Sequence, residues 1–232
     1  MTAQPASAVI EALREFQSDA ELARVRKRLS PDEPAIGTRM DDLVTVAREH
    51  AGLELAEVRK LLDHPSYEAR MAAMCILDFR ARSDPDDDER RALCRVYLER
   101  HDRITTWDMV DRAAPQVVGG WFVGRDKKNL IDLAGSACPL RRRTAITAPL
   151  HFLQAGDDDD VAAGTAIARR LVSAPEPVVH KAVGIFLRRL GSRDRDQLLG
   201  FLREHASAMP RTALRLAISA LDDDIRRQIL RH

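Results

Sequence analysis

Apolar residues recur along the chain at the three- and four-residue spacing of an amphipathic helix, and the two-residue alternation of a strand is nearly absent. In residues 66–81, for example, Ala69, Ala73 and Ile76 fall on one helical face. The pattern therefore predicts an all-α protein. We expect helices at residues 7–16, 40–50, 55–62, 66–81, 89–99, within 104–122, and at 129–134, 141–153, 161–172, 178–190, 193–204, 210–221 and 223–230.

Short acidic, serine- and proline-containing stretches separate these segments. Acidic side chains are favoured at helix starts because they accept from free N–H groups and suit the helix dipole. The stretches lack the DxDxDG spacing of a calcium loop, so we interpret them as helix caps. They lie at residues 63–66, 83–89, 157–160 and 173–177.

Several of the predicted helices share a motif that begins with a basic residue and continues with alanine. These helices recur in pairs about every 35 to 45 residues, which is typical of HEAT-like repeats. Such a repeat cannot bury its apolar face alone, so neighbouring pairs stack. Because several of the helices start with basic residues that can contact phosphates, we expect one HEAT-like α-solenoid domain over residues 1–232, built of stacked antiparallel helix pairs with a concave DNA-binding face. The motif appears as RMAAMCILDFRAR, RRTAITAPLHFL, HKAVGIFLRRLG and RTALRLAISAL.

The basic starts of these helices predict a row of cations along one edge of the concave face. Cations next to helix N-termini are a suitable surface for a phosphate backbone. The alternative is that they are solvated helix ends. The residues concerned are Arg70, Arg141, Arg142, Arg143, His180, Lys181 and Arg211.

Composition adds few constraints. The 232 residues are 45% hydrophobic and 31% charged, as in ordinary globular proteins, and the net charge of +1 gives no global attraction to DNA. The basic residues are mostly arginine, which either indicates phosphate binding or reflects genome composition. No apolar run approaches the roughly 18 residues of a membrane span, and no signal peptide is evident, so we expect a cytoplasmic protein.

The cysteines and histidines do not suggest a metal site. The 3 cysteines are widely spaced, without a CxxC pair, and the 7 histidines lack the HxxxH spacing. We expect free thiols and no metal ion or cofactor.

The stretch from Ile104 to Phe122 contains both tryptophans of the chain. Trp107 and Asp111 are four residues apart and share a helix face. This pair is either a core tryptophan beside a solvated capping acid or a site that holds a cation. Asp108 points about 100° away and is expected to cap or to pair with an arginine. We expect Trp121 to pack at the helix end, and Tyr67 and Tyr97 to be structural.

Five stretches in order resemble the DNA alkylation repair proteins of the AlkD type, which are HEAT-like DNA glycosylases. The resemblance covers roughly residues 20–220. Three positions differ from the family pattern: Asp41 or Asp42 stands where proline is common, Ile185 replaces a second tryptophan, and Leu140 replaces an aromatic residue. The matching stretches are Gly37-Thr38-Arg39-Met40, Leu61–Pro65 with Glu68-Ala69-Arg70, Trp107–Asp111 with Ala114-Pro115 and Gly119, Arg142–Ile146, and Lys181–Gly184.

The resemblance implies an enzyme that removes cationic alkylpurines such as 3-methyladenine and 7-methylguanine from double-stranded DNA. It implies that Asp111 is the catalytic carboxylate, that Trp107 is an aromatic wall and that Arg143 clamps the DNA backbone. Arg39 joins the basic row as a DNA contact. A monomer associated with the nucleoid is expected.

Two alternatives remain open at this level. One is a non-catalytic HEAT protein that binds DNA, which Ile185 favours. The other is a protein-interaction solenoid that binds no nucleic acid, which the near-neutral charge favours.

Overall fold

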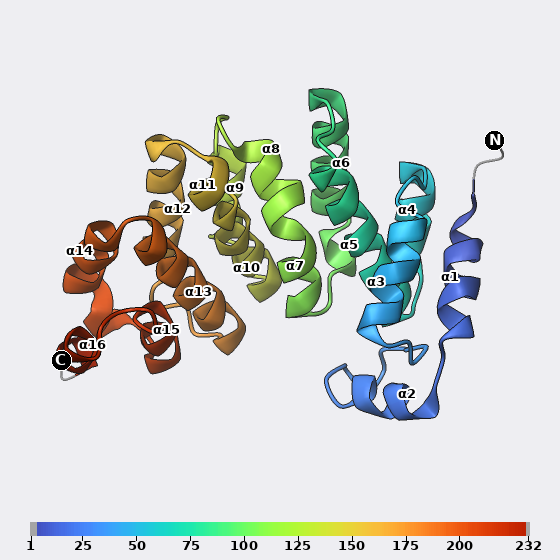
Figure 1. The fold of residues 1–232 in the computed structure, drawn as a ribbon, viewed down its shortest axis with the longest axis horizontal. Coiled ribbons are helices and arrows are strands. Elements are labelled where there is room, and N and C mark those ends of the chain that lie inside the picture. The colour runs from blue at the N-terminus through green and yellow to red at the C-terminus, as the bar shows by residue number, and fades with distance from the viewer. Residues whose placement is uncertain (1–3, 231–232) are drawn as a thin grey trace. The chain divides into compact units, whose positions relative to one another are not determined.

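The computed structural model describes residues 4–230. Within this range the chain is helical and contains no β-strand, only an isolated bridge between Gln17 and Thr38. The prediction of an all-α, solenoid-type fold is confirmed. The chain divides into two compact units, Met1–Val117 and Val118–His232, which are described separately. Figure 1 labels the helices and colours them along the chain. The single domain expected over residues 1–232 stays a prediction, and its outermost residues, 1–3 and 231–232, lie outside the described range.

The first unit is arranged around α5, the longest helix of its described part. Nearly every side chain of α5 is buried, including those of Glu68, Arg70 and Asp78, because α3, α4 and α7 all pack against it. The helices of this unit are α1 (Ala6–Glu15), α2 (Asp19–Arg26), α3 (Met40–Glu49), α4 (Leu55–Asp63), α5 (Tyr67–Arg82), α6 (Asp87–Glu99) and α7 (Trp107–Ala113), with a 3₁₀ turn at His101–Arg103.

The second unit is arranged around α13, which packs against α10, α14 and α15. A side chain at Gly184 would bring its Cβ to 2.7 Å from the Ala213 carbonyl oxygen, so only glycine allows α13 and α15 to pack this closely. The helices are α8 (Gly120–Phe122), α9 (Lys128–Leu133), α10 (Pro139–Thr147), α11 (Phe152–Ala155), α12 (Asp158–Arg170), α13 (Pro177–Arg193), α14 (Arg195–His205), α15 (Arg211–Ala217) and α16 (Asp223–Leu230), with 3₁₀ turns at Ala148–Leu150 and Ala206–Ala208.

Side-chain caps confirm the interpretation for three of the four stretches, whereas Glu176, in the stretch at residues 173–177, makes no side-chain hydrogen bond to the start of α13. Ser66 accepts from the Ala69 N–H at the start of α5, and Asp86 accepts from the Glu89 N–H at the start of α6. Asp157 forms a full capping box at the start of α12. These side chains satisfy N–H groups that have no partner within the helix.

Two predicted helices are interrupted at proline. A proline has no N–H to donate to the carbonyl four residues earlier, so a regular α-helix cannot continue through it. After α7 the chain widens into a π-helical turn, Ala114–Gly119, which contains Pro115 and the boundary between the two units. In the second unit, Pro149 lies in the 3₁₀ turn that separates α10 from α11.

Helix α2 was not predicted from the apolar pattern. Val25 is its only buried residue, so it lacks a repeated apolar face. Ser18 caps it by accepting from the Glu21 N–H at 3.2 Å, and this Ser-x-x-Glu spacing is the sequence feature that indicates the helix.

Candidate functional site

Helix α7 presents two different faces. Met109, Val110 and Ala113 are buried against the first unit, whereas 53% of the Trp107 surface is exposed and Asp111 is partly exposed. One turn of helix separates Trp107 from Asp111, so the indole and the carboxylate share the outward face. The alternative in which Trp107 is a core residue is therefore excluded.

Asp108 attaches the first turn of α7 to two other elements. Its Oδ2 atom accepts from the Tyr67 hydroxyl at 2.7 Å and from the Arg28 guanidinium at 3.0 Å. Arg28 also donates to the Tyr67 hydroxyl oxygen at 3.3 Å. The prediction that Asp108 pairs with an arginine is confirmed, and Tyr67, which is 1% exposed, is structural as expected.

Arg112 attaches the last turn of α7 to α5. Its guanidinium lies 3.7 Å from the buried Asp78 carboxylate, which also pairs with Arg82 at 2.9 Å. Asp108 and Arg112 are four residues apart and share a helix face. This face, which contacts the rest of the first unit, lies next to the outward face with Trp107 and Asp111. The two polar contacts fix the rotation of α7, and with it the direction of its outward face.

The Tyr67 hydroxyl remains protonated and acts as a hydrogen-bond donor. Burial raises the pKa of Tyr67 far above its usual value, and the neighbouring Asp108 carboxylate raises it further. A protonated hydroxyl can donate its proton to the Asp108 carboxylate.

A pocket of about 520 Å³ lies beside this network in the first unit. Three guanidinium groups line it, and their side chains are largely exposed: 73% for Arg24, 47% for Arg28 and 57% for Arg39. Tyr67 lies in its wall, and Glu21 and Asp41 add negative charge. Each arginine also pairs with an acid, Arg24 with Glu21 at 2.7 Å, so an anion would bind the guanidinium N–H groups that these pairs leave exposed.

Arg39, predicted as a DNA contact, has only weak internal ion pairs. Its guanidinium lies 3.6 Å from Asp41 and 3.6 Å from Asp42, at the start of α3. The preceding Gly37 has a φ angle of +94°, and a Cβ there would lie 2.8 Å from the Ser18 carbonyl oxygen. Glycine is therefore required at the turn that brings Arg39 to the pocket.

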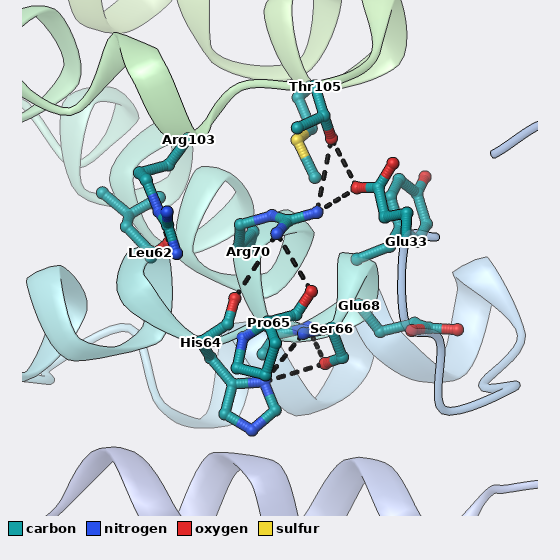
Figure 2. A network of polar contacts seen from close by, with 12 residues as sticks. Glu33, Leu62, His64, Pro65, Ser66, Glu68, Arg70, Arg103 and Thr105 are labelled. Atoms are coloured by element: carbon teal, nitrogen blue, oxygen red, sulfur yellow. Dashed lines mark hydrogen bonds and ion pairs between the residues drawn. The ribbon is translucent and has the colours of Figure 1, made fainter. Parts of the chain in front are cut away.

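Arg70, predicted as a second DNA contact, is buried and holds the first unit together (Figure 2). It forms an ion pair with Glu33 and donates to the carbonyl oxygen of Pro65 at 3.0 Å. It also contacts Thr105 at 3.3 Å. The expectation that Arg70 lies in an exposed row is wrong, because its side chain is 7% exposed and satisfies polar groups inside the unit.

Arg143 and Arg142 on α10 also face inward. Arg143, predicted as the backbone clamp, is 2% exposed and donates to the carbonyl oxygen of Val178. Arg142 pairs with Glu176 and donates to the carbonyl oxygen of Ser136 at 2.6 Å. The expectation of an exposed position is wrong for Arg143, because its guanidinium bonds within the second unit.

The other predicted contacts of the second unit are accessible to different degrees. Lys181 and Arg211 are exposed, and Arg141 is partly exposed. Ile185, the position that differs from the family pattern, is partly exposed on α13. Trp121 is partly buried and lies under the Arg125 guanidinium, 4.3 Å from the ring centre.

Among residues 4–230 no group of three or more His, Cys, Asp or Glu side chains is arranged to hold a metal ion. Cys75 and Cys94 are buried, and burial raises the pKa of these thiols to about 11 and about 12. Cys138 is exposed. No helix in the described part of the chain is long and apolar enough to cross a membrane.

Sequence patterns did not single out Arg24 and Arg28 as candidate ligands. Arg24 lies on α2, the helix that the apolar pattern does not show, and Arg28 lies just after it. Arg28 is 80 residues from Asp108, and no local spacing connects the two. The capping pattern of Ser18 and Glu21 was the only available indication.

Comparison with known proteins adds a family and a fold. A family model described as DNA alkylation repair enzyme matches residues 9–221. The structure is similar to that of a protein titled "Predicted DNA alkylation repair enzyme from Enterococcus faecalis", with a TM-score of 0.65 and 15% sequence identity, over 90% of this chain and 98% of that one. No match was found among curated protein sequences. At this identity the structural similarity establishes the fold alone.

Proposed function

Because the chain belongs to the family of DNA alkylation repair enzymes, and hence to DNA repair, we propose that it is a DNA glycosylase. It hydrolyses the N-glycosidic bond of cationic alkylpurines, of the 3-methyladenine and 7-methylguanine type, in duplex DNA. The observation that carries this proposal is the outward face of α7, which presents a half-exposed indole and a carboxylate one helical turn apart.

The chemistry suits a carboxylate without a general-acid partner. A purine alkylated at the 3- or 7-position carries a positive charge and is already a good leaving group. As it departs, the sugar acquires the character of an oxocarbenium ion. Asp111 stabilises this cation: at about 4 Å and an effective dielectric of 20, the attraction is about 4 kcal/mol. That is sufficient for a rate increase of a hundredfold or more.

Asp111 also orients the attacking water, which completes the hydrolysis. The Trp107 indole beside it offers a π surface to the cationic base or sugar, worth about 0.5 to 2 kcal/mol. Both groups act on charge that is present or develops at the lesion, so an unmodified purine gains less from them.

The arginine-lined pocket supplies contacts to the DNA backbone in the first unit. Arg24, Arg28 and Arg39 have exposed side chains that can form paired hydrogen bonds with phosphate oxygens. Arg141, Lys181 and Arg211 are accessible in the second unit and provide further contacts there. Phosphate contacts of this kind hold the duplex independently of sequence.

The test is release of bases from methylated duplex DNA. We expect the purified protein to release 7-methylguanine or 3-methyladenine, measured by chromatography under single-turnover conditions. Asp111→Asn keeps the size of the side chain and removes its charge, and we expect it to lower the release rate at least a hundredfold. Asp102→Asn, at an exposed acid of the 3₁₀ turn before α7, is the matched control.

An equal rate for Asp111→Asn and the wild type would refute the proposed role of Asp111. Absence of release, together with duplex binding that weakens as salt rises, would support a second candidate, a non-catalytic DNA-binding protein. Ile185 favours that candidate because the family pattern has a tryptophan there. Absence of both release and binding at low salt would support a protein-interaction solenoid.

We further propose that the protein acts as a monomer in the cytoplasm, associated with the nucleoid. We propose association with the nucleoid because the proposed substrate is duplex DNA. Sedimentation of the free protein and of its complex with a short duplex tests the monomer.

A further inference from the structure

Three residues that are distant in the sequence meet at the first turn of α7. Arg28 follows α2, Tyr67 begins α5 and Asp108 is the second residue of α7. The hydroxyl of Tyr67 donates to Asp108 at 2.7 Å, and Arg28 donates to Asp108 at 3.0 Å and to Tyr67 at 3.3 Å. The three groups thus form a closed triangle beside Trp107 and one turn before Asp111.

We propose that Tyr67, Asp108 and Arg28 are positioning residues that hold the Trp107 indole and the Asp111 carboxylate in place for base release. This inference rests on the proposed glycosylase function. It adds residues that contact neither the base nor the sugar and act through the orientation of α7.

The start of α7 requires such support. The N-cap residue, Thr106, makes no side-chain hydrogen bond to the first turn, and α7 is only 7 residues long before the π-helical turn begins. A first turn without an N-cap side chain leaves its free N–H groups without that partner and is less stable. The Asp108 triangle fixes the first turn from outside the helix, and the Arg112–Asp78 pair fixes the last turn.

The geometry of the triangle allows one arrangement of hydrogen bonds. Arg28 has only donors, so it fills an acceptor site on the Tyr67 oxygen. The Tyr67 proton must then point to the Asp108 carboxylate, which accepts it at 2.7 Å. A single defined pattern limits rotation of α7, and a displacement of about 1 Å in a catalytic group can cost about a hundredfold in rate.

Arg28 belongs both to the triangle and to the wall of the arginine-lined pocket, and 47% of its side chain is exposed. Tyr67 is 1% exposed, so its hydroxyl acts only through its hydrogen bonds to Asp108 and Arg28 and offers no donor to DNA. The two residues should therefore give different kinetic results. Tyr67 variants alter the chemical step, whereas Arg28 variants alter the chemical step and DNA affinity together.

The first experiment measures single-turnover base release and the Kd for the same duplex. We expect Tyr67→Phe, which removes one oxygen atom, to lower the release rate about tenfold with Kd unchanged. We expect Arg28→Gln to lower the rate similarly and to raise Kd severalfold. Asp108→Ala should lower the rate further than Asp108→Asn, because asparagine retains an oxygen that accepts from Tyr67.

Tyr97→Phe is the matched control. Tyr97 is the other tyrosine of the chain, is also buried, and lies on α6. Loss of its hydroxyl should leave the release rate within about twofold of the wild type. If Tyr97→Phe and Tyr67→Phe lower the release rate equally, and circular dichroism shows an equal loss of folded protein in both, the positioning role is overturned.

The second experiment does not depend on catalysis. In a Trp121→Phe background, Trp107 is the single tryptophan, so its fluorescence anisotropy and acrylamide quenching report the mobility of the first turn of α7. We expect Tyr67→Phe to lower the anisotropy and increase the quenching. Unchanged fluorescence would overturn the proposal even if the wild type releases bases. If the wild type releases no base, the proposed function is refuted. A fluorescence change in Tyr67→Phe would then still show that the triangle holds the first turn of α7.

Discussion

Arginines in the two units have different surroundings, and the sequence predicted only Arg39 of the first group but both Arg142 and Arg143 of the second as ligands for DNA. In the first unit, the side chains of Arg24, Arg28 and Arg39 are 73%, 47% and 57% exposed around a pocket. In the second unit, the Arg142 side chain is 14% exposed and Arg143 is 2% exposed. Both groups bond to acceptors of their own unit, but the first group keeps exposed N–H donors that can bind an external anion, whereas the second is removed from solvent.

The difference shows that an arginine can serve either purpose. A guanidinium has five N–H donors and no acceptor, so it suits a phosphate and equally suits the free carbonyl groups of a turn. Arg143 donates to the carbonyl oxygen of Val178, and Arg142 to that of Ser136. In both cases a neighbouring segment approaches closely enough to remove the guanidinium from solvent.

The largest expected difference between the arginines of the two units is in how much each contributes to the free energy of unfolding. Arg143→Ala should lower the free energy of unfolding by about 3 kcal/mol, because it leaves a cavity and a carbonyl group without its donor. Urea denaturation measures the change. Arg39→Ala should change the free energy of unfolding by less than about 0.5 kcal/mol, as is usual for exposed side chains. Equal losses in the two variants would remove the distinction between buried and available arginines.

The next largest expected effect is on the affinity of the pocket arginines for duplex DNA. Replacing Arg24 and Arg39 together with glutamine should weaken duplex binding about tenfold or more at moderate salt. It should also reduce the slope of log affinity against log salt by about 2, because each lost phosphate contact contributes about 0.9. Fluorescence anisotropy of a labelled duplex across a salt series gives both quantities.

The control for this double variant carries the same change of charge elsewhere in the first unit. Arg91 and Arg95 are exposed on α6, so Arg91→Gln/Arg95→Gln keeps the net charge equal to that of the test variant. A similar loss of affinity and slope in both double variants would show that the pocket has no special role in binding.

The apolar pattern was sufficient to predict most helices of the fold. Its limits have physical causes in particular residues. Helix α2 buries only Val25, so hydrophobic periodicity could not show it. Pro149 and Pro115 interrupt expected helices because each lacks an N–H, and only the structure shows whether the chain kinks, ends or widens there.

The candidate site was predictable where it depends on local spacing. Four-residue spacing places Trp107 and Asp111 on one face, and the structure shows that this face points outward. Spacing could not show that Arg70 pairs with Glu33, because contact between distant segments decides which side chains are buried. The meeting of Arg28, Tyr67 and Asp108 depends on the tertiary fold for the same reason.

A smaller effect on stability is expected at Trp107. Since 53% of Trp107 is exposed, Trp107→Ala should lower the free energy of unfolding by only about 1 to 2 kcal/mol. The rise in the activation free energy of base release should be larger than this loss in the free energy of unfolding. Phe186→Ala, at a fully buried aromatic of α13, should cost about 3 to 5 kcal/mol and sets the scale for a core position. A comparable loss at Trp107, measured by thermal denaturation, would mean that the indole supports the core.

The smallest effect concerns the carboxylate that pairs with Arg142. The hydrogen bond from Arg142 holds the pKa of Glu176 below its usual value. A carboxylate whose pKa is lower in the folded state contributes stability above its unfolded pKa of about 4.3 and loses it as the pH falls through the lower, folded value. Arg142→Gln should therefore raise the pKa of Glu176, followed by NMR titration of its side-chain carboxyl carbon. The variant should also lose less stability than the wild type between pH 6 and pH 3, by less than about 1 kcal/mol because the pair is partly solvated. An unchanged pKa of Glu176 in Arg142→Gln would show that Arg142 does not bind this carboxylate. Arg142 could then bind an external anion, as we propose for the arginines of the pocket.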